Sequence, residues 1–111
     1  MFVNDILDSC EKIRIYTAGM GANGFLADRC VYDASLRNLE IIGEAAKHLP
    51  TEVRAQIPGI EWTKIAGMRD WLAHAYFGLD DEIIWNVIET RLPELERAVR
   101  AFNDTDESES S

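Results

Sequence analysis

Residues 69–76 read "RDWLAHAY" and carry Arg69, His74 and Tyr76 in an otherwise apolar, helix-like stretch. Arginine and histidine are costly to bury without partners, so a core helix normally avoids both. An arginine guanidinium can bind phosphate oxygens in a bidentate manner and can stabilise negative charge in a transition state. A histidine with a pKa near neutrality can move a proton at physiological pH. The segment therefore contains residue types suited to chemistry on a phosphodiester.

These side chains would suffice for cleavage of RNA without a metal ion. A base would remove the proton of a 2′-hydroxyl, the oxygen would attack the adjacent phosphate, and an acid would protonate the leaving 5′-oxygen. Arg69 and His74 are the candidates for these roles, and Asp70 could orient the imidazole or hold the guanidinium. The alternative from spacing alone is a structural His74, ordinary surface charge at Arg69 and Asp70, and a core aromatic at Tyr76.

Helical spacing by itself does not bring the two catalytic candidates together. At 3.6 residues per turn, Arg69 and His74 lie about 140° apart on a helix. They could converge if Arg69 extends along the helix, or if the helix distorts near Gly78. A second copy of the chain could also place its own motif across a shared cleft. Small chains gain buried surface by association, which favours this third arrangement.

The charge of the chain excludes some classes of function. Its 111 residues carry a formal charge of −9, which argues against a protein that coats nucleic acid through a broad basic surface. A polyanion would have to bind at a small, focused site. The segment 103–111, "NDTDESESS", holds four acidic residues and no basic one. It predicts a disordered acidic tail after a single domain over residues 1–102.

The metal-binding residue types are too sparse to predict a metal or a cofactor. Cys10 and Cys30 form neither a disulfide framework nor a CxxC pair, and both fit apolar helical patterns as small core residues. His48 and His74 have no cysteines or carboxylates around them at the spacing of zinc ligands. No secretory signal or membrane-spanning stretch is recognisable either, so the cytoplasm is the expected location.

The pattern of apolar residues predicts an all-α protein. Glycines in the segment 18–24 should end a first helix, Pro93 should kink or split the last one, and the segment 50–62 reads as a connector with one short helical turn. Steps of three and four between apolar residues predict main helices over about 3–17, 25–48, 62–77 and 80–102. The expected architecture is an up-and-down bundle of four main helices with an additional short helix.

Four stretches of the chain resemble one known family. "GMRDWLAHAYFGLD" is similar to the R-x4-H-x-Y motif of the HepT-like toxins in the HEPN superfamily. "FLADRC", "LRNLEIIGEAAKHLP" and "IWNVIETRLPEL" resemble the flanking signatures of that family, in the same order. The resemblance extends from about residue 2 to residue 102. A bare R-x4-H would be weak support, whereas the combined series is specific.

The resemblance implies a homodimeric helical bundle with two Arg–His motifs around one cleft. It also implies a metal-independent ribonuclease, the toxin of a type II or type VII-like toxin–antitoxin system. Its partner would be a minimal nucleotidyltransferase of the MNT type, which neutralises the toxin and can transfer AMP to the motif tyrosine. On this mapping Arg69 and His74 are catalytic, Asp70 is a supporting residue and Tyr76 is the modification site.

Two features of the chain depart from that simple mapping. The family commonly has Asn where this chain has Asp70, which adds a negative charge near the phosphate. The acidic composition also favours an alternative from another class of function. In that alternative the chain is a non-catalytic helical partner of the nucleotidyltransferase.

Overall fold

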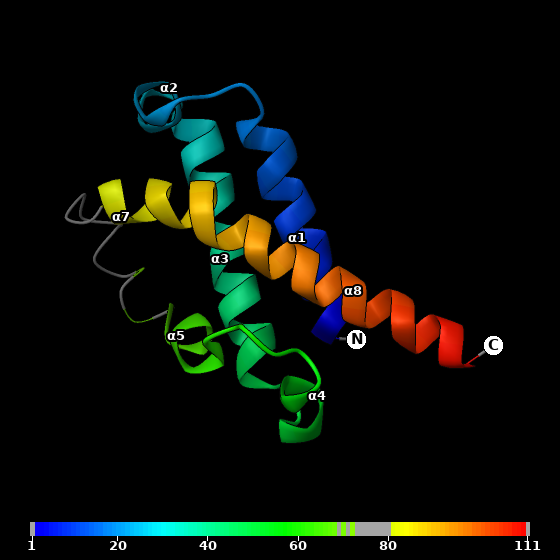
Figure 1. Cartoon of the computed structure of the whole chain (residues 1–111). Coiled ribbons are helices and arrows are strands. Elements are labelled where there is room, and N and C mark those ends of the chain that lie inside the picture. Colours follow the sequence, from blue (N-terminus) through cyan, green and yellow to red (C-terminus); the bar gives the residue numbers. More distant parts are fainter. Residues whose placement is uncertain (1, 69, 71, 73–80, 111) are drawn as a thin grey trace.

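The structure is a computed structural model that describes residues 2–68, 70, 72 and 81–110, with side chains up to residue 104. These residues form helices and connecting turns and contain no strand, which confirms the all-α prediction (Figure 1). The elements are α1 (Phe2–Thr17), α2 (Ala22–Ala27), α3 (Arg29–Lys47), α4 (Thr51–Ala55), α5 (Trp62–Ala66), α7 (Asp81–Asn86), the π-helix η1 (Val87–Arg91) and α8 (Leu92–Ser110). None of the helices in this described part of the chain is long and apolar enough to span a membrane.

The helix α3 is the centre of the fold. It packs against α1 along one side and against α5 on another, while α8 crosses α1 (Figure 1). Apolar side chains at helical spacing meet between these elements, so the predicted stripes face one shared core. The most deeply buried members of that core are Ile6, Ile13, Leu36, Leu39, Ile42, Leu95 and Val99.

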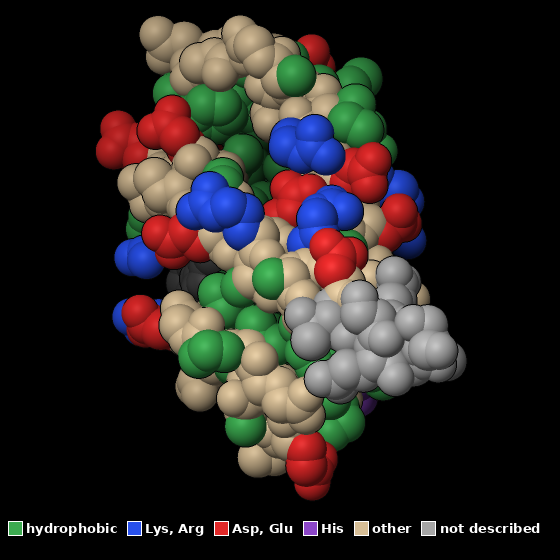
Figure 2. Space-filling model, turned by 45° about the vertical axis from the view of Figure 1, so that its right-hand side comes forward, with side chains coloured by type: hydrophobic (Ala, Val, Ile, Leu, Met, Phe, Trp, Pro, Cys, Tyr) green, Lys and Arg blue, Asp and Glu red, His purple; other side chains and the backbone are tan. Residues whose placement is uncertain are grey.

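A charged bridge ties α1 to α8 at the edge of the core. The carboxylate of Glu96 accepts a hydrogen bond from Arg14 Nε of α1 at 3.3 Å and one from Arg100 Nη2 at 2.9 Å. The face shown in Figure 2 carries interspersed acidic and basic side chains, with no block of one sign among the described residues. Nothing on this face offers the broad basic surface that non-specific nucleic-acid binding requires.

The two cysteines differ in their surroundings. Cys10 is buried in the core, and burial raises the pKa of its thiol to about 12, so the thiolate that would react is disfavoured. The prediction of a core cysteine is therefore confirmed for Cys10. It is wrong for Cys30, which is exposed near the start of α3.

The predicted helix over 25–48 is two helices, α2 and α3, which are separated at Asp28. The Asp28 carboxylate accepts a hydrogen bond from the backbone N–H of Val31 at 3.1 Å and caps the start of α3. At the other end of α3, Arg54 Nη2 donates to the carbonyl oxygens of Ala46 and Lys47 at 2.6 and 3.3 Å. Helix ends leave backbone groups without partners, and these side chains satisfy several of them.

The predicted kink at Pro93 takes the form of a π-helical turn. Proline has no N–H, and its ring would clash with the carbonyl four residues earlier, here that of Glu89. The turn before it widens, so that the N–H of Leu92 bonds to the carbonyl oxygen of Val87, five residues back. The helix therefore continues from η1 into α8 without a break.

The end of α8 differs from the predicted tail. Its backbone stays helical to Ser110, where the composition of residues 103–111 predicts disorder. Extending an existing helix adds a backbone hydrogen bond for each residue ordered, so even a polar sequence can prolong it. Phe102 is half-buried and packs against the core, whereas Asp104 is exposed. The domain boundary near residue 102 stays a prediction.

Candidate functional site

The three residues that define the predicted site, Arg69, His74 and Tyr76, lie outside the residues that the structure describes. Of the four predicted site residues only Asp70 is described. Described residues nevertheless lie on both sides of the motif in sequence. Met68 precedes it, Leu72 lies within it, and Asp81 is the first described residue after it. The question is what holds these flanking residues in place.

On the N-terminal side, two buried residues anchor the motif to the core. Met68 and Leu72 are only 2% and 0% exposed, and their spacing of four residues places them on one helical face. Asp70 lies between them in sequence and is exposed, and its backbone N–H donates to the carbonyl oxygen of Gly67 at 3.1 Å. The polar Asp70 therefore faces solvent, where a charged substrate could approach it.

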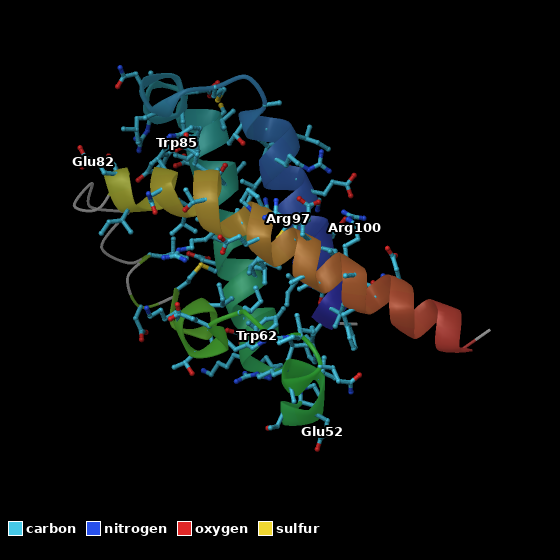
Figure 3. All side chains as sticks on the ribbon, in the orientation of Figure 1. Glu52, Trp62, Glu82, Trp85, Arg97 and Arg100 are labelled. Atoms are coloured by element: carbon cyan, nitrogen blue, oxygen red, sulfur yellow. The ribbon has the colours of Figure 1, made fainter. Side chains whose placement is uncertain are left out.

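The helix that leads into the motif is itself fixed by a buried tryptophan. Trp62 opens α5, is 8% exposed, and donates from Nε1 to the carbonyl oxygen of Ile57 at 3.4 Å (Figure 3). The predicted long helix over 62–77 is interrupted: α5 ends at Ala66 and Gly67 forms a turn. Helical backbone is present again at Met68, Asp70 and Leu72, and the rest of the predicted range lies outside the described residues.

On the C-terminal side, a hydrogen bond joins α7 to α3. The hydroxyl of Tyr32, a buried residue of α3, donates to a carboxylate oxygen of Asp81 at 2.5 Å. Burial, and then this hydrogen bond, raise the pKa of Tyr32 to about 12. The guanidinium of Arg29 lies over the Tyr32 ring, 4.7 Å from its centroid. Asp81 is the first described residue after the motif, so this contact fixes the place where the chain leaves the site.

Aromatic packing supports the same junction. The ring centroid of Phe25 lies 5.5 Å from that of Tyr32 and 5.2 Å from that of Trp85 on α7 (Figure 3). Aromatic pairs at such distances contribute beyond the area that they bury. Sequence reasoning did not predict the hydrogen bond between Tyr32 and Asp81, because Asp81 lies 49 residues further along the chain than Tyr32.

We expect Tyr32→Phe to lower the free energy of unfolding by about 1 to 3 kcal/mol, since it deletes one hydrogen bond to a charged acceptor. The pKa of Tyr32 in the folded protein is raised above its ordinary value of 10, so the protonated hydroxyl contributes its full share to the free energy of unfolding below pH 10. This contribution is lost as the pH rises from 10 to about 12. Urea titrations at several pH values should show this added loss in the wild type and not in Tyr32→Phe. Tyr16→Phe, at an exposed position on α1, is the matched control and should behave as wild type.

No group of three or more His, Cys, Asp or Glu side chains suited to a metal ion occurs among the described residues. His48, the other histidine of the chain, contacts Glu44 and Phe2. Its Nε2 lies 3.2 Å from Glu44 Oε1, and its ring stacks on Phe2 with the centroids 5.4 Å apart. These contacts give His48 a structural place near the end of α3.

Comparison with known proteins identifies the family of this chain. The model of the family described as "Ribonuclease HepT-like" matches residues 6–102. "Putative RNase TTE0752" of Caldanaerobacter subterraneus subsp. tengcongensis is 42% identical over 99 residues, which cover 89% of this chain and 88% of that protein. "Probable ribonuclease HepT" of Thermococcus cleftensis is 38% identical over 94 residues, 85% of this chain and 86% of its own. No solved structure matches significantly. The extent of the family match and the identity of these relatives show that the chain belongs to the HepT-like ribonuclease family.

Proposed function

We propose that this protein is an RNA endonuclease in which Arg69 and His74 act without a metal ion. The observation that carries the proposal is the family match over residues 6–102, a range that contains both residues. The exposed position of Asp70 between two buried anchors supports it, because a polymeric substrate needs a solvent-facing site. Each proposed residue then has a distinct task.

Arg69 stabilises the negative charge that builds up on the phosphate as the new bond forms. His74 moves a proton, either from the attacking 2′-hydroxyl or to the leaving 5′-oxygen. The 2′-oxygen forms a bond to phosphorus while the bond from phosphorus to the 5′-oxygen breaks. The products are one strand that ends in a 2′,3′-cyclic phosphate and one that begins with a 5′-hydroxyl. Asp70 supports the pair by orienting one of the two side chains.

We also propose that the active form is a homodimer. The offset of about 140° between Arg69 and His74 on a regular helix leaves a single copy poorly arranged for a concerted step. Two copies that share a cleft can supply the guanidinium from one chain and the imidazole from the other. A chain of this size also gains buried apolar surface by association.

A direct test is incubation of the purified protein with single-stranded RNA in the presence of EDTA. We expect cleavage that is unaffected by the chelator, and cyclic phosphate ends that are identified by mass spectrometry. Light scattering on the same sample should report about twice the chain mass of 12.6 kDa. Cleavage that stops in EDTA, or products that end in a simple 3′-hydroxyl, would contradict the mechanism. A monomer that cleaves RNA at the full rate would contradict the shared cleft.

The biological setting that we propose is a toxin–antitoxin pair in the cytoplasm. The partner is a minimal nucleotidyltransferase of the MNT type, which neutralises the ribonuclease by binding it or by transferring AMP to Tyr76. The position of Tyr76 supports the second route, since it lies two residues beyond His74 in sequence.

A second candidate function is a non-catalytic helical subunit that docks the same nucleotidyltransferase. The formal charge of −9 favours it, because an acidic body disfavours association with RNA. The EDTA experiment distinguishes the two functions, because a docking subunit would leave the RNA intact. Such a subunit would still bind its nucleotidyltransferase.

A further inference from the structure

A groove beside the motif has the features of a binding site for one nucleotide. It has a volume of about 200 Å³ and lies between α5 on one side and the α7–η1 segment on the other. Ile65, Met68, Ile83 and Val87 line it with apolar groups, and Lys64 and Arg91 stand among its lining residues as cations. Ile83 is 51% exposed, an unusual position for a large apolar side chain in a chain of this size.

The charges at the groove favour an anion. Lys64 Nζ lies 2.8 Å from Glu61 Oε2, and this contact lowers the pKa of Glu61, with a smaller effect from Arg91. Two cations therefore face one carboxylate. Within the described part of the chain, Arg91 takes part in no hydrogen bond or ion pair. Arg91 interacts electrostatically with Glu61, which is itself paired with Lys64, so its guanidinium keeps donors for an anion on a body whose formal charge is −9.

Ile83, Val87 and Arg91 are spaced four residues apart, so they share the face of the α7–η1 segment that lines the groove. The wider turn of η1 begins at Val87 and ends at Arg91, while Ile88 and Leu92 hold the segment to the core. Such insertions re-aim the side chains of a helix and are frequent at functional sites. Pro93 enforces the turn, because it cannot donate the regular hydrogen bond.

The groove is also continuous in sequence with the proposed catalytic residues. Met68 contributes to its floor and immediately precedes Arg69. On the far side, Ile83 follows Asp81, the residue that Tyr32 holds. Arg69 lies outside the described residues, so its adjacency in sequence to Met68 is what links the groove to the proposed catalytic pair.

We propose that this groove binds one nucleotide of the RNA substrate next to the scissile phosphate. The base lies on the apolar floor, and its phosphate binds to Arg91, with Lys64 as the second cation. The volume is below the range of about 300–1,000 Å³ for sites that hold drug-sized ligands, and a single base is a suitable occupant. Glu61 also lines the groove but is paired with Lys64, and the apolar floor offers no hydrogen bonds to base edges, so this subsite should tolerate different bases. The inference rests on the proposed ribonuclease function.

Arg91→Gln and Ile83→Ala test the two halves of this subsite. Arg91→Gln should raise the KM for single-stranded RNA about tenfold, as expected for the loss of one charge-assisted hydrogen bond. It should also reduce the slope of log Kd against log salt concentration by the amount that about one phosphate contact contributes. Ile83→Ala should raise KM without changing that slope, because it removes apolar contact alone. Arg97→Gln, an exposed arginine on α8 away from the groove, is the matched control and should leave both quantities unchanged (Figure 3).

A second readout does not depend on cleavage. A fluorescent RNA with a 2′-deoxy nucleotide at the cleavage position cannot react, and its anisotropy reports binding. Weaker binding by Arg91→Gln would support the subsite even if the wild type cleaves no RNA, an outcome that would reject only the ribonuclease. Cleavage by the wild type with an unchanged KM and salt slope in both groove variants would overturn the subsite. Conversion of a dimer to a monomer by Ile83→Ala would also overturn it, since a second copy would then fill the groove.

Discussion

Replacing His74 or Arg69 with alanine should lower the rate of RNA cleavage by about two to three powers of ten, the effect of removing one general acid–base group or one charge-stabilising donor. Neither change should unfold the protein, because the buried apolar core is formed by other residues of the chain. The measurement is single-turnover cleavage of a labelled RNA, with circular dichroism to confirm that each variant is folded. Equal rates for the wild type and both variants would identify a contaminating nuclease and contradict the assignment.

Asp70→Asn provides the matched control at the neighbouring position. It keeps the shape and polarity of the side chain but removes a negative charge from an exposed site beside the proposed phosphate contact. We expect equal or stronger RNA binding and no large loss of rate. A fall as steep as that of His74→Ala would instead assign Asp70 a direct part in proton transfer.

The second large effect concerns control of the enzyme. A phenol has a pKa of about 10 and is a poor nucleophile at neutral pH, so Tyr76 would need a partner enzyme to activate it. The phenolic oxygen would attack the α-phosphorus of ATP, pyrophosphate would leave, and the phenolic proton would pass to a base of that partner. The attached AMP brings a negative phosphate to a residue seven positions, or about two helical turns, from Arg69, and that phosphate can occupy the place of the RNA backbone. Inhibition would then be competitive and would not require unfolding.

Tyr76→Phe should retain cleavage and lose modification completely, because no proton-transfer role is assigned to the hydroxyl. Intact-mass spectrometry after incubation with an MNT-type nucleotidyltransferase, ATP and Mg²⁺ measures the transfer. Tyr16→Phe, which removes an exposed tyrosine from α1, should still gain AMP. An AMP increment on Tyr76→Phe, or none on the wild type, would reject this switch. Control by binding of the antitoxin alone would then be the better account.

The sequence by itself determined the class of the fold and the family. The steps of three and four between apolar residues predicted α1 almost to its ends, and Ile6, Cys10 and Ile13 are buried as that pattern requires. Such patterns succeed because the amphipathic period is a local property of the chain. The series of motifs around Arg69 and His74 identified the family in the same way, since it can be read along the chain without knowledge of packing.

Only the tertiary structure decided how the elements end and what holds the site. The apolar pattern left open that Asp28 caps a separate helix and that the backbone widens into a π-helical turn before Pro93, and the structure shows both. The bond from Tyr32 to Asp81 and the groove between α5 and η1 join segments distant in sequence. No local pattern encodes such a pair, because each partner only acquires its environment when α3, α5 and α7 pack together.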